Sequence, residues 1–411
     1  MSDERMVFAH LIAAILLALA WASPAVAADG TGADCGGLDD PDTFVIADPR
    51  GLIQACSRVI EGAATPREKS IALINRASAY RAKAISAKPD DGTADRAASA
   101  ADLDEAVRLD PTFAFAYYAR GLGAFFDPGR SGFEDFDAAI RLDPNFAPAY
   151  IGRARLYGRN NDYRRAEADY SAALRLDARL ARAYLGRGGA RRMNGDDDGA
   201  IADFSEALRL SAASRDAAER NVSLHAAESR GGTYFARGEF DRAVADFDDA
   251  LRIDPKDHSA LAHRALVELM RGALDQARAD FAEASELAPA NADIALWREI
   301  ADRRAHSPGR LADAAANFSK SVWPASAVHA FLGEPSPRAM LDEASAAPDS
   351  FPVVKQWQIC QAHVFAGELA LLKEAKGEAA EAFAAAERAC PNGAPERGVA
   401  AAELKGLGGA N

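Results

Sequence analysis

The chain has 411 residues, a formal net charge of −13 and 27% charged residues. The acidic balance argues against a nucleic-acid-binding protein, which needs a basic surface, and against docking on anionic lipid by surface charge. The length would suggest more than one globular domain. Length does not predict the number of domains in a repeat solenoid, however, because such a chain lengthens by stacking further repeats.

Residues 1–27 are predicted to be an export signal. The apolar run from Val7 to Trp21 is short for a membrane span, and Ala25-Val26-Ala27 has the small-x-small pattern of a signal-peptidase site. Cleavage would release the chain into the periplasm with no membrane insertion. The residues before the apolar run are barely basic, so an uncleaved anchor is the alternative.

The mature chain has four cysteines, one pair near each end: Cys35, Cys56, Cys360 and Cys390. An even number suits an oxidising compartment. Residues 28–43 are expected to form a flexible leader, followed by an N-terminal capping helix within 44–69. A disulfide between Cys35 and Cys56 could attach the leader to that helix.

Seven stretches of the chain then fit one template of about 34 residues, a period that predicts stacked helical hairpins. They end at Pro111, Pro144, Ala178, Ala212, Pro255, Pro289 and Pro391. Eight residues before these ends stand Leu103, Phe136, Tyr170, Phe204, Phe247, Phe281 and Phe383. Alanines five residues before the ends let the helices approach, the bulky residue fills the groove between hairpins, and proline stops the second helix.

These recurring offsets resemble the tetratricopeptide (TPR) family. The resemblance implies an all-α, right-handed superhelical solenoid whose first helices line a concave, ligand-binding surface. The expected divisions are six repeats in 70–291, a degenerate repeat with irregular helices in 292–359, a final repeat in 360–393, and a C-terminal helix and tail in 394–411. Within the degenerate repeat, Leu311 to Phe318 suits a second helix.

Most repeats also carry an arginine in the first helix and an aspartate just before the bulky residue of the second. The pairs are Arg76 with Asp102, Arg120 with Asp135, Arg153 with Asp169, Arg187 with Asp203, Arg230 with Asp246, and Arg264 with Asp280. The final repeat has Ala366 and Ala382 instead, so both partners are lost together. We expect an ion pair inside each hairpin, since the planar guanidinium suits a carboxylate. The alternative is that the arginines face a ligand.

The final repeat places Cys360 at its first position and Cys390 next to its last. These positions lie side by side in an antiparallel hairpin, so a disulfide is geometrically reasonable. Two free buried thiols are the alternative. The tract from Trp323 to Glu368 more weakly resembles the C-terminal halves of NlpI-type envelope adaptors. That resemblance implies an alternative function, an adaptor that regulates an envelope protease or a cell-wall hydrolase.

No catalytic motif is visible, and His258 and His263, five residues apart, do not share a helix face for a metal. We therefore predict no enzymatic activity and no cofactor. The expected role is a protein-protein interaction scaffold with a protein or peptide partner; an oligomer is possible.

Two groups in the expected first helices are candidate binding residues. One is an apolar stripe, for which core packing is the alternative: Phe115, Tyr118, Leu122, Phe125 and Phe126. The other is a basic group: Arg155, Arg159, Arg182 and Arg192. Arginines gathered on an acidic chain could capture an acidic peptide or a terminal carboxylate, and a solvated face is the alternative.

Overall fold

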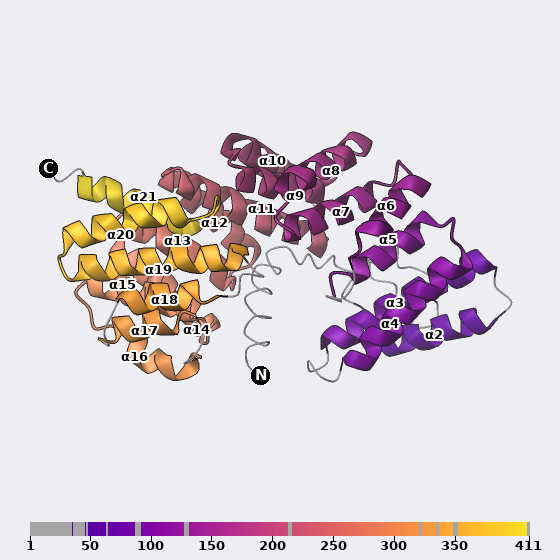
Figure 1. Ribbon diagram of the computed structural model, residues 1–411, viewed down its shortest axis with the longest axis horizontal. Coiled ribbons are helices and arrows are strands. Elements are labelled where there is room, and N and C mark those ends of the chain that lie inside the picture. Colours follow the sequence, from indigo (N-terminus) through magenta and orange to yellow (C-terminus); the bar gives the residue numbers. More distant parts are fainter. Residues whose placement is uncertain are drawn as a thin grey trace. The chain divides into compact units, whose positions relative to one another are not determined.

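The computed structural model contains only helices in the part of the chain it describes (Figure 1). The expected signal and all of the leader except Cys35 lie outside that part. None of the helices in this part is both long and apolar enough to cross a membrane. The described residues are 35, 46, 48–62, 65–86, 92–126, 131–212, 216–319, 323–333, 337–347 and 352–408.

The helices follow one another in antiparallel order along the chain. Their bounds are α2 (Pro49–Glu61), α3 (Pro66–Ser86), α4 (Thr93–Leu109), α5 (Ala114–Gly123), α6 (Phe133–Leu142), α7 (Ala147–Arg159), α8 (Tyr163–Leu176), α9 (Ala181–Asn194), α10 (Asp197–Ser211), α11 (Ala217–Ala236), α12 (Phe240–Ile253), α13 (His258–Met270), α14 (Leu274–Leu287), α15 (Ala292–Arg304), α16 (Leu311–Ala314), the 3₁₀ turn η1 (Ala315–Asn317), α17 (Ala325–Phe331), α18 (Pro337–Ser345), α19 (Pro352–Leu372), α20 (Lys376–Ala389) and α21 (Pro395–Gly408).

The contacts divide the chain into two units. Among the described residues, the N-terminal unit comprises those from 35 to 190 and from 209 to 222, and the C-terminal unit comprises those from 191 to 208 and from 223 to 408. In the N-terminal unit, α3 packs on α4, α5 on α6, and α7 on α8, and successive hairpins contact each other through α4 with α5 and α6 with α7. This is the stacked-hairpin arrangement that the repeat template predicts.

The bulky residue of a second helix is held between two first helices. Phe136 of α6 is fully buried. A Cβ atom at Gly121, in the first helix of its own hairpin, would lie 2.9 Å from the ring, and one at Gly152, in the next hairpin, 2.4 Å from it. Both glycines therefore allow first helices to approach the aromatic ring, which joins one hairpin to the next.

The turn between hairpins is fixed by an aspartate at the end of the second helix. Asp143 caps α6 and accepts a hydrogen bond from the backbone N–H of Asn145 at 3.0 Å. Asp110 and Asp177 do the same for residues two positions later. Such Asx turns give the backbone a local alternative to further helix, so the second helix ends here.

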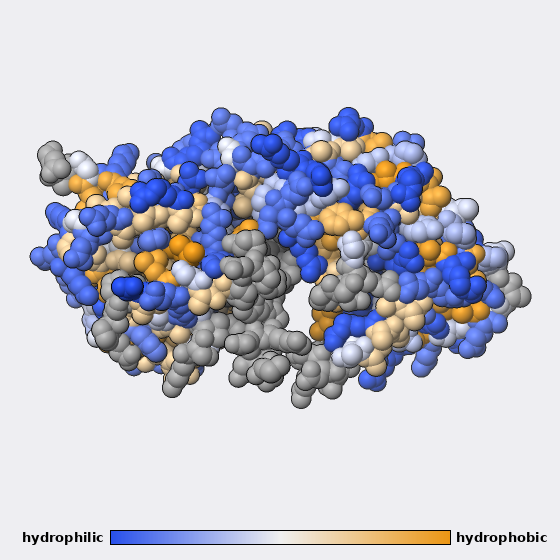
Figure 2. All heavy atoms as spheres, viewed as in Figure 1, coloured by the Kyte–Doolittle hydropathy of each residue, from blue (hydrophilic) through white to orange (hydrophobic). Residues whose placement is uncertain are grey.

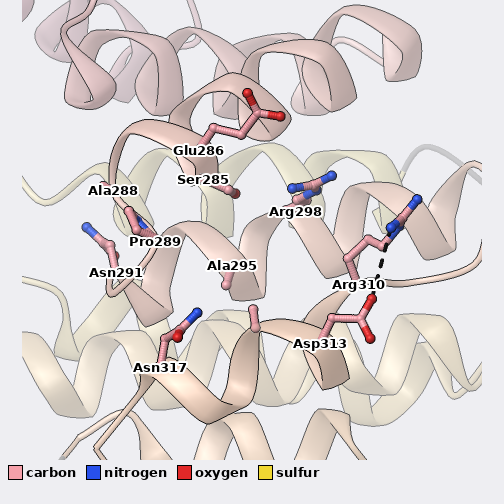
Figure 3. Close-up of a pocket in the computed structure, with 11 residues that line it drawn as sticks. Ser285, Glu286, Ala288, Pro289, Asn291, Ala295, Arg298, Arg310, Asp313 and Asn317 are labelled. Atoms are coloured by element: carbon pink, nitrogen blue, oxygen red, sulfur yellow. Dashed lines mark ion pairs between the residues drawn. The ribbon is translucent and has the colours of Figure 1, made fainter.

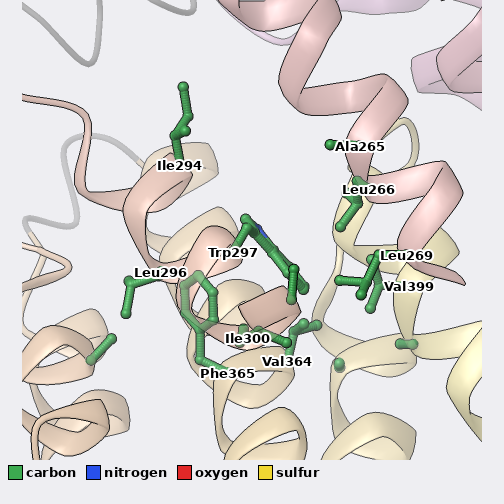
Figure 4. Packing of buried hydrophobic residues seen from close by; sticks show 14 of the residues in the cluster. Ala265, Leu266, Leu269, Ile294, Leu296, Trp297, Ile300, Val364, Phe365 and Val399 are labelled. Atoms are coloured by element: carbon green, nitrogen blue, oxygen red, sulfur yellow. The ribbon is translucent and has the colours of Figure 1, made fainter. Parts of the chain in front are cut away.

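The C-terminal unit contains the α13–α14 and α19–α20 hairpins, with α15 and the shorter helices α16, α17 and α18 between them. The rings of Trp297 in α15 and Phe365 in α19 lie 5.5 Å apart in its core, and Val399 of α21 is fully buried in the same cluster (Figure 4). The helix expected from Leu311 to Phe318 is shorter than predicted, because α16 has four residues and η1 takes over at Ala315.

Candidate functional site

An arginine joins the two helices of a hairpin. Arg230 of α11 donates from Nε and Nη2 to the two carboxylate oxygens of Asp246 in α12, at 2.9 and 2.6 Å. Asp246 is 4% exposed. The same hydrogen-bonded contact joins Arg76 to Asp102, Arg120 to Asp135, Arg153 to Asp169, and Arg264 to Asp280. The Arg187 and Asp203 pair stays a prediction, since its residues belong to different units.

The same arginines also donate hydrogen bonds to a side chain on the second helix of the preceding hairpin. The repeat pattern did not predict this second contact. Arg153 Nη1 donates to Asp137 at 2.6 Å, and Arg230 Nη1 donates to Ser205 at 2.9 Å. Corresponding bonds join Arg76 to Ser57, Arg120 to Asp104, Arg187 to Ser171, and Arg264 to Asp248. The signal in the sequence is an Asp-x-Asp or Asp-x-Ser motif, whose first residue pairs within its hairpin and whose second pairs with the next arginine.

Replacing Arg230 and Asp246 by alanine, singly and together, is expected to give a coupling energy of about 1–3 kcal/mol. Each single change leaves a half-buried or buried charge without its partner, so the double variant should be less destabilised than the sum. Urea unfolding of the four proteins measures this. The exposed pair of Arg252 and Asp249, also on α12, is the control and should couple by less than about 0.5 kcal/mol. If the losses in the free energy of unfolding were additive at both pairs, Arg230 and Asp246 would not interact inside the hairpin.

In the C-terminal unit, the side formed by the first helices is covered by the chain's own last helix. Helix α21 contacts α13 and α19, and its Gly398 lies against Phe235 of α11, where a Cβ atom would be 3.2 Å from the ring. Arg304 of α15 bonds Glu368 of α19 at 2.5 Å and Glu403 of α21 at 2.7 Å. This face is thus occupied by α21.

Of the four basic candidates, Arg192 belongs to this unit and lies against the segment that leads into α21. A Cβ atom at Gly393 would be 2.9 Å from Arg192 Nε, and one at Gly232 would be 3.3 Å from its Nη1. Asn392 donates to the carbonyl of Met193 at 3.2 Å. Arg192 therefore packs against the chain itself, which favours an internal role over ligand binding.

The other three basic candidates lie in the N-terminal unit and are half-buried. The guanidinium of Arg155 lies 4.5 Å from the centre of the Phe125 ring, and Arg159 Nη1 donates to the carbonyl of Ala124 at 3.3 Å. Burial raises the pKa of Tyr170 to about 12, while the nearby charges of Arg155 and Arg182 act to lower it. α7 and α9 thus bring Arg155 and Arg182 near one buried ring.

The apolar stripe is divided by burial. Tyr118 is 6% exposed and Leu122 is fully buried, so core packing is favoured for these two. Phe115 packs partly buried on Tyr118, whereas Phe125 and Phe126 are half-buried beside Arg155 and Arg81 respectively. The segment after α5 therefore places one aromatic ring, that of Phe125, beside a basic candidate.

Large exposed apolar side chains elsewhere are scattered along the described residues: Val59, Ile71, Ile85, Leu142, Leu176, Ile253, Leu287 and Leu332. Four of them stand at the same place near the end of a second helix, one per hairpin. On the face that Figure 2 shows, the hydrophobic groups of the described residues are separated by hydrophilic side chains.

Two disulfides close loops at the two ends of the described chain. Cys35 is bonded to Cys56 of α2, with the Cα atoms 4.6 Å apart, and Cys360 of α19 is bonded to Cys390 after α20, with the Cα atoms 4.7 Å apart. Within the described residues, no three His, Cys, Asp or Glu side chains are grouped to hold a metal ion.

The stacked hairpins and the arginines that join them define the protein as an all-α repeat solenoid. A family model described as tetratricopeptide repeat matches residues 151–217 and 230–292. The chain contains tetratricopeptide repeats in these two segments. Repeats of this family form protein-protein interaction scaffolds and are typically non-enzymatic.

Several solved structures are similar to the chain. A TPR protein from Parabacteroides merdae is 19% identical, with a TM-score of 0.44, covering 72% of this chain and 98% of its own. PilF of Pseudomonas aeruginosa is 21% identical, with a TM-score of 0.43, covering 50% and 88%. YrrB, a TPR protein with an unusual peptide-binding site, is 19% identical, with a TM-score of 0.37, covering 46% and 92%. No curated protein sequence matches significantly.

Proposed function

We propose that the protein is a periplasmic scaffold that binds an acidic segment of a partner protein on the N-terminal unit, through Arg155, Arg159 and Arg182. The observation that carries the proposal is the stacking of Arg155 on Phe125, which places a cation and an aromatic ring together at the first helices of adjacent hairpins. Acidic segments bind basic clusters by charge-assisted hydrogen bonds, and aromatic rings add apolar contact area.

We place the binding surface on the N-terminal unit because the corresponding face of the C-terminal unit is already occupied. There, α21 covers the first helices, so a partner would have to displace a helix that contributes buried residues such as Val399. The periplasmic location is supported by the cleavage pattern at Ala25-Val26-Ala27 and by the two disulfides, which persist in oxidising compartments. The resemblance to NlpI-type adaptors stays a prediction.

A charge-reversal experiment tests the surface. Arg155, Arg159 and Arg182 are changed together to glutamate, and proteins retained from a periplasmic extract are compared with those retained by the unchanged chain. We expect the retained partner to be lost, because three attractive contacts become repulsive.

The control changes three arginines that are exposed on or after α8, Arg164, Arg175 and Arg179, to glutamate. It alters the net charge by the same amount, so it should retain the partner. Equal retention by all three proteins, or equal loss in both variants, would refute the proposed surface.

A further inference from the structure

One arginine occupies the repeat position of the internal arginines but lacks their acceptors. In regular hairpins the first acceptor lies 16 residues after the arginine, as for Arg264 and Asp280, and the second lies 16 residues before it, as for Arg264 and Asp248. Arg298 of α15 stands at the equivalent position. Alanine occupies both acceptor positions, at Ala314 and Ala282.

The side chain of Arg298 makes no hydrogen bond to any described residue, and its nearest carboxylate is Asp302 Oδ2 at 4.0 Å from Nε. Asp302 is already bonded through Oδ1 to Arg278 Nε at 2.8 Å. The side chain of Arg298 is nevertheless only 26% exposed. None of its nitrogens is a buried atom without a partner, so the guanidinium is reached by solvent and not held by an acceptor among the described residues.

A pocket lies beside Arg298 and one of the two alanines, Ala314. It has a volume of about 240 Å³, and Ala314, Ala295 and Arg298 are among the residues that line it. Figure 3 shows Arg298 and Arg310 on one side of the pocket and Asn291 and Asn317 on the other. The pocket therefore has charged and amide side chains around it, next to the position where other hairpins hold an aspartate.

The two acidic residues of the lining do not fill that place. Glu286 is exposed, and its carboxylate points away from the middle of the pocket in Figure 3. Asp313 is 79% exposed and lies 4.0 Å from Arg310, which is 66% exposed. Arg298 is thus the half-buried cation of the pocket, and the other charges are at its solvent-exposed rim.

The final repeat shows what happens when the internal pair is simply lost. There, alanine replaces both the arginine and the aspartate, at Ala366 and Ala382, so no charge remains without a partner. In the α15 hairpin the arginine is kept while both acceptors are lost. Degeneration of the repeat therefore explains the alanines, but it does not explain the retained arginine.

We propose that this pocket binds a carboxylate of a partner peptide, which takes the place of the absent aspartate beside Arg298. Bidentate arginine-carboxylate contact is the geometry that the regular hairpins already use, and Asn291 and Asn317 supply side-chain amides across the pocket. The carboxylate belongs to an acidic side chain or to a chain terminus. The proposal does not rest on the proposed function, because all of these residues belong to the C-terminal unit.

Calorimetric titration of the full chain with three pentapeptides tests the proposal and separates the two sources. One peptide, with both ends blocked, is Ala-Phe-Asp-Phe-Ala; the second is Ala-Phe-Ala-Phe-Ala with a free C-terminal carboxylate; the third is the second with both ends blocked. At least one carboxylate peptide should bind, and the neutral peptide should not. Equal binding of all three, or of none at millimolar concentration, would overturn the proposal.

Two variants locate the binding. Arg298→Ala and Ala314→Asp should each weaken it by at least about tenfold, the first by removing the cation and the second by supplying an internal carboxylate. Arg310→Ala, at the exposed rim, should change it by less than about threefold. Binding that survives Ala314→Asp unchanged would place the peptide elsewhere.

Thermal unfolding gives a readout that does not need the peptide. Ala314→Asp should raise Tm, and the gain should vanish in the double variant with Arg298→Ala. The control Ala312→Asp, at an exposed position of α16, should leave Tm nearly unchanged. If Ala314→Asp lowered Tm, the new carboxylate would be behaving as an unpaired charge in a half-buried site. That result would contradict the proposal that Arg298 is positioned to bind a carboxylate.

Discussion

Gly152→Ala is expected to lower the free energy of unfolding of the N-terminal unit by about 3 kcal/mol. The added methyl group would meet Phe136 Cε1 at 2.4 Å, closer than real Cβ contacts come. The ring cannot easily move away, because it is fully buried and Gly121 of its own hairpin lies on it as well. Overpacking a closely packed core costs about 1–3 kcal/mol and sometimes more, which exceeds the helix propensity that alanine gains. Urea unfolding measures the loss.

The same substitution six residues later is expected to act in the opposite direction. Gly158 also lies on α7, and a Cβ atom there would meet nothing within 4 Å. Gly158→Ala should therefore stabilise by about 0.5–1 kcal/mol, because alanine loses less backbone entropy on forming a helix. If both substitutions changed the free energy of unfolding in the same direction, contact with Phe136 would not control the packing of α7.

The hairpins could be predicted because their determinants are local and recur. Phe136, Ala139 and Pro144 stand at offsets that repeat along the chain. The residue at each offset has one structural role, since it fills the groove, allows close approach or ends the helix. The arginine-aspartate pairs were predictable in the same way, since Ala366 and Ala382 replace both partners together. A comparison between repeats separates residues that build the hairpin from residues that vary.

The packing of α21 could not be predicted from such offsets. Its contacts join Glu403 to Arg304 and Gly398 to Phe235, residues far apart in the sequence. Whether they meet depends on the small rotation between successive hairpins, added over several repeats, and the template does not contain that quantity. The same limit explains Arg192, whose repeat position indicates a ligand-facing side chain but which lies beside Gly393.

The second acceptor of each arginine was visible in the sequence but needed the structure to be understood. Asp137 and Asp248 look like ordinary exposed aspartates, two residues after the pairing aspartate. Only the stacking of hairpins shows that they bond the arginine of the next hairpin. Once that rule is known, Ala282 and Ala314 become informative, because they identify Arg298 as the arginine that lacks both acceptors.

Buried carboxylates in the C-terminal unit are expected to make its stability fall as pH rises from about 4 to about 7. Burial raises the pKa of Asp293 from 3.8 to about 7, with a further rise from the nearby charge of Glu396. Burial also raises the pKa of Glu396 and takes that of Glu368 to about 7. The folded state therefore binds more protons than the unfolded state between the two pKa values, and stability is lost as the pH increases through that window.

Asp293→Asn is expected to remove the largest single part of this dependence. A shift of about 3 pKa units corresponds to at most about 4 kcal/mol, present below pH 4 and lost above pH 7. Asparagine has the same shape and does not ionise, so the variant should match the unchanged chain near pH 4 and be more stable near pH 8. Urea unfolding at both pH values measures the difference. Asp275→Asn, at a side chain 96% exposed on α14, is the control and should keep the full dependence. If Asp293→Asn lost stability with pH as steeply as this control, the ionisation of Asp293 would not be what lowers the stability of the C-terminal unit.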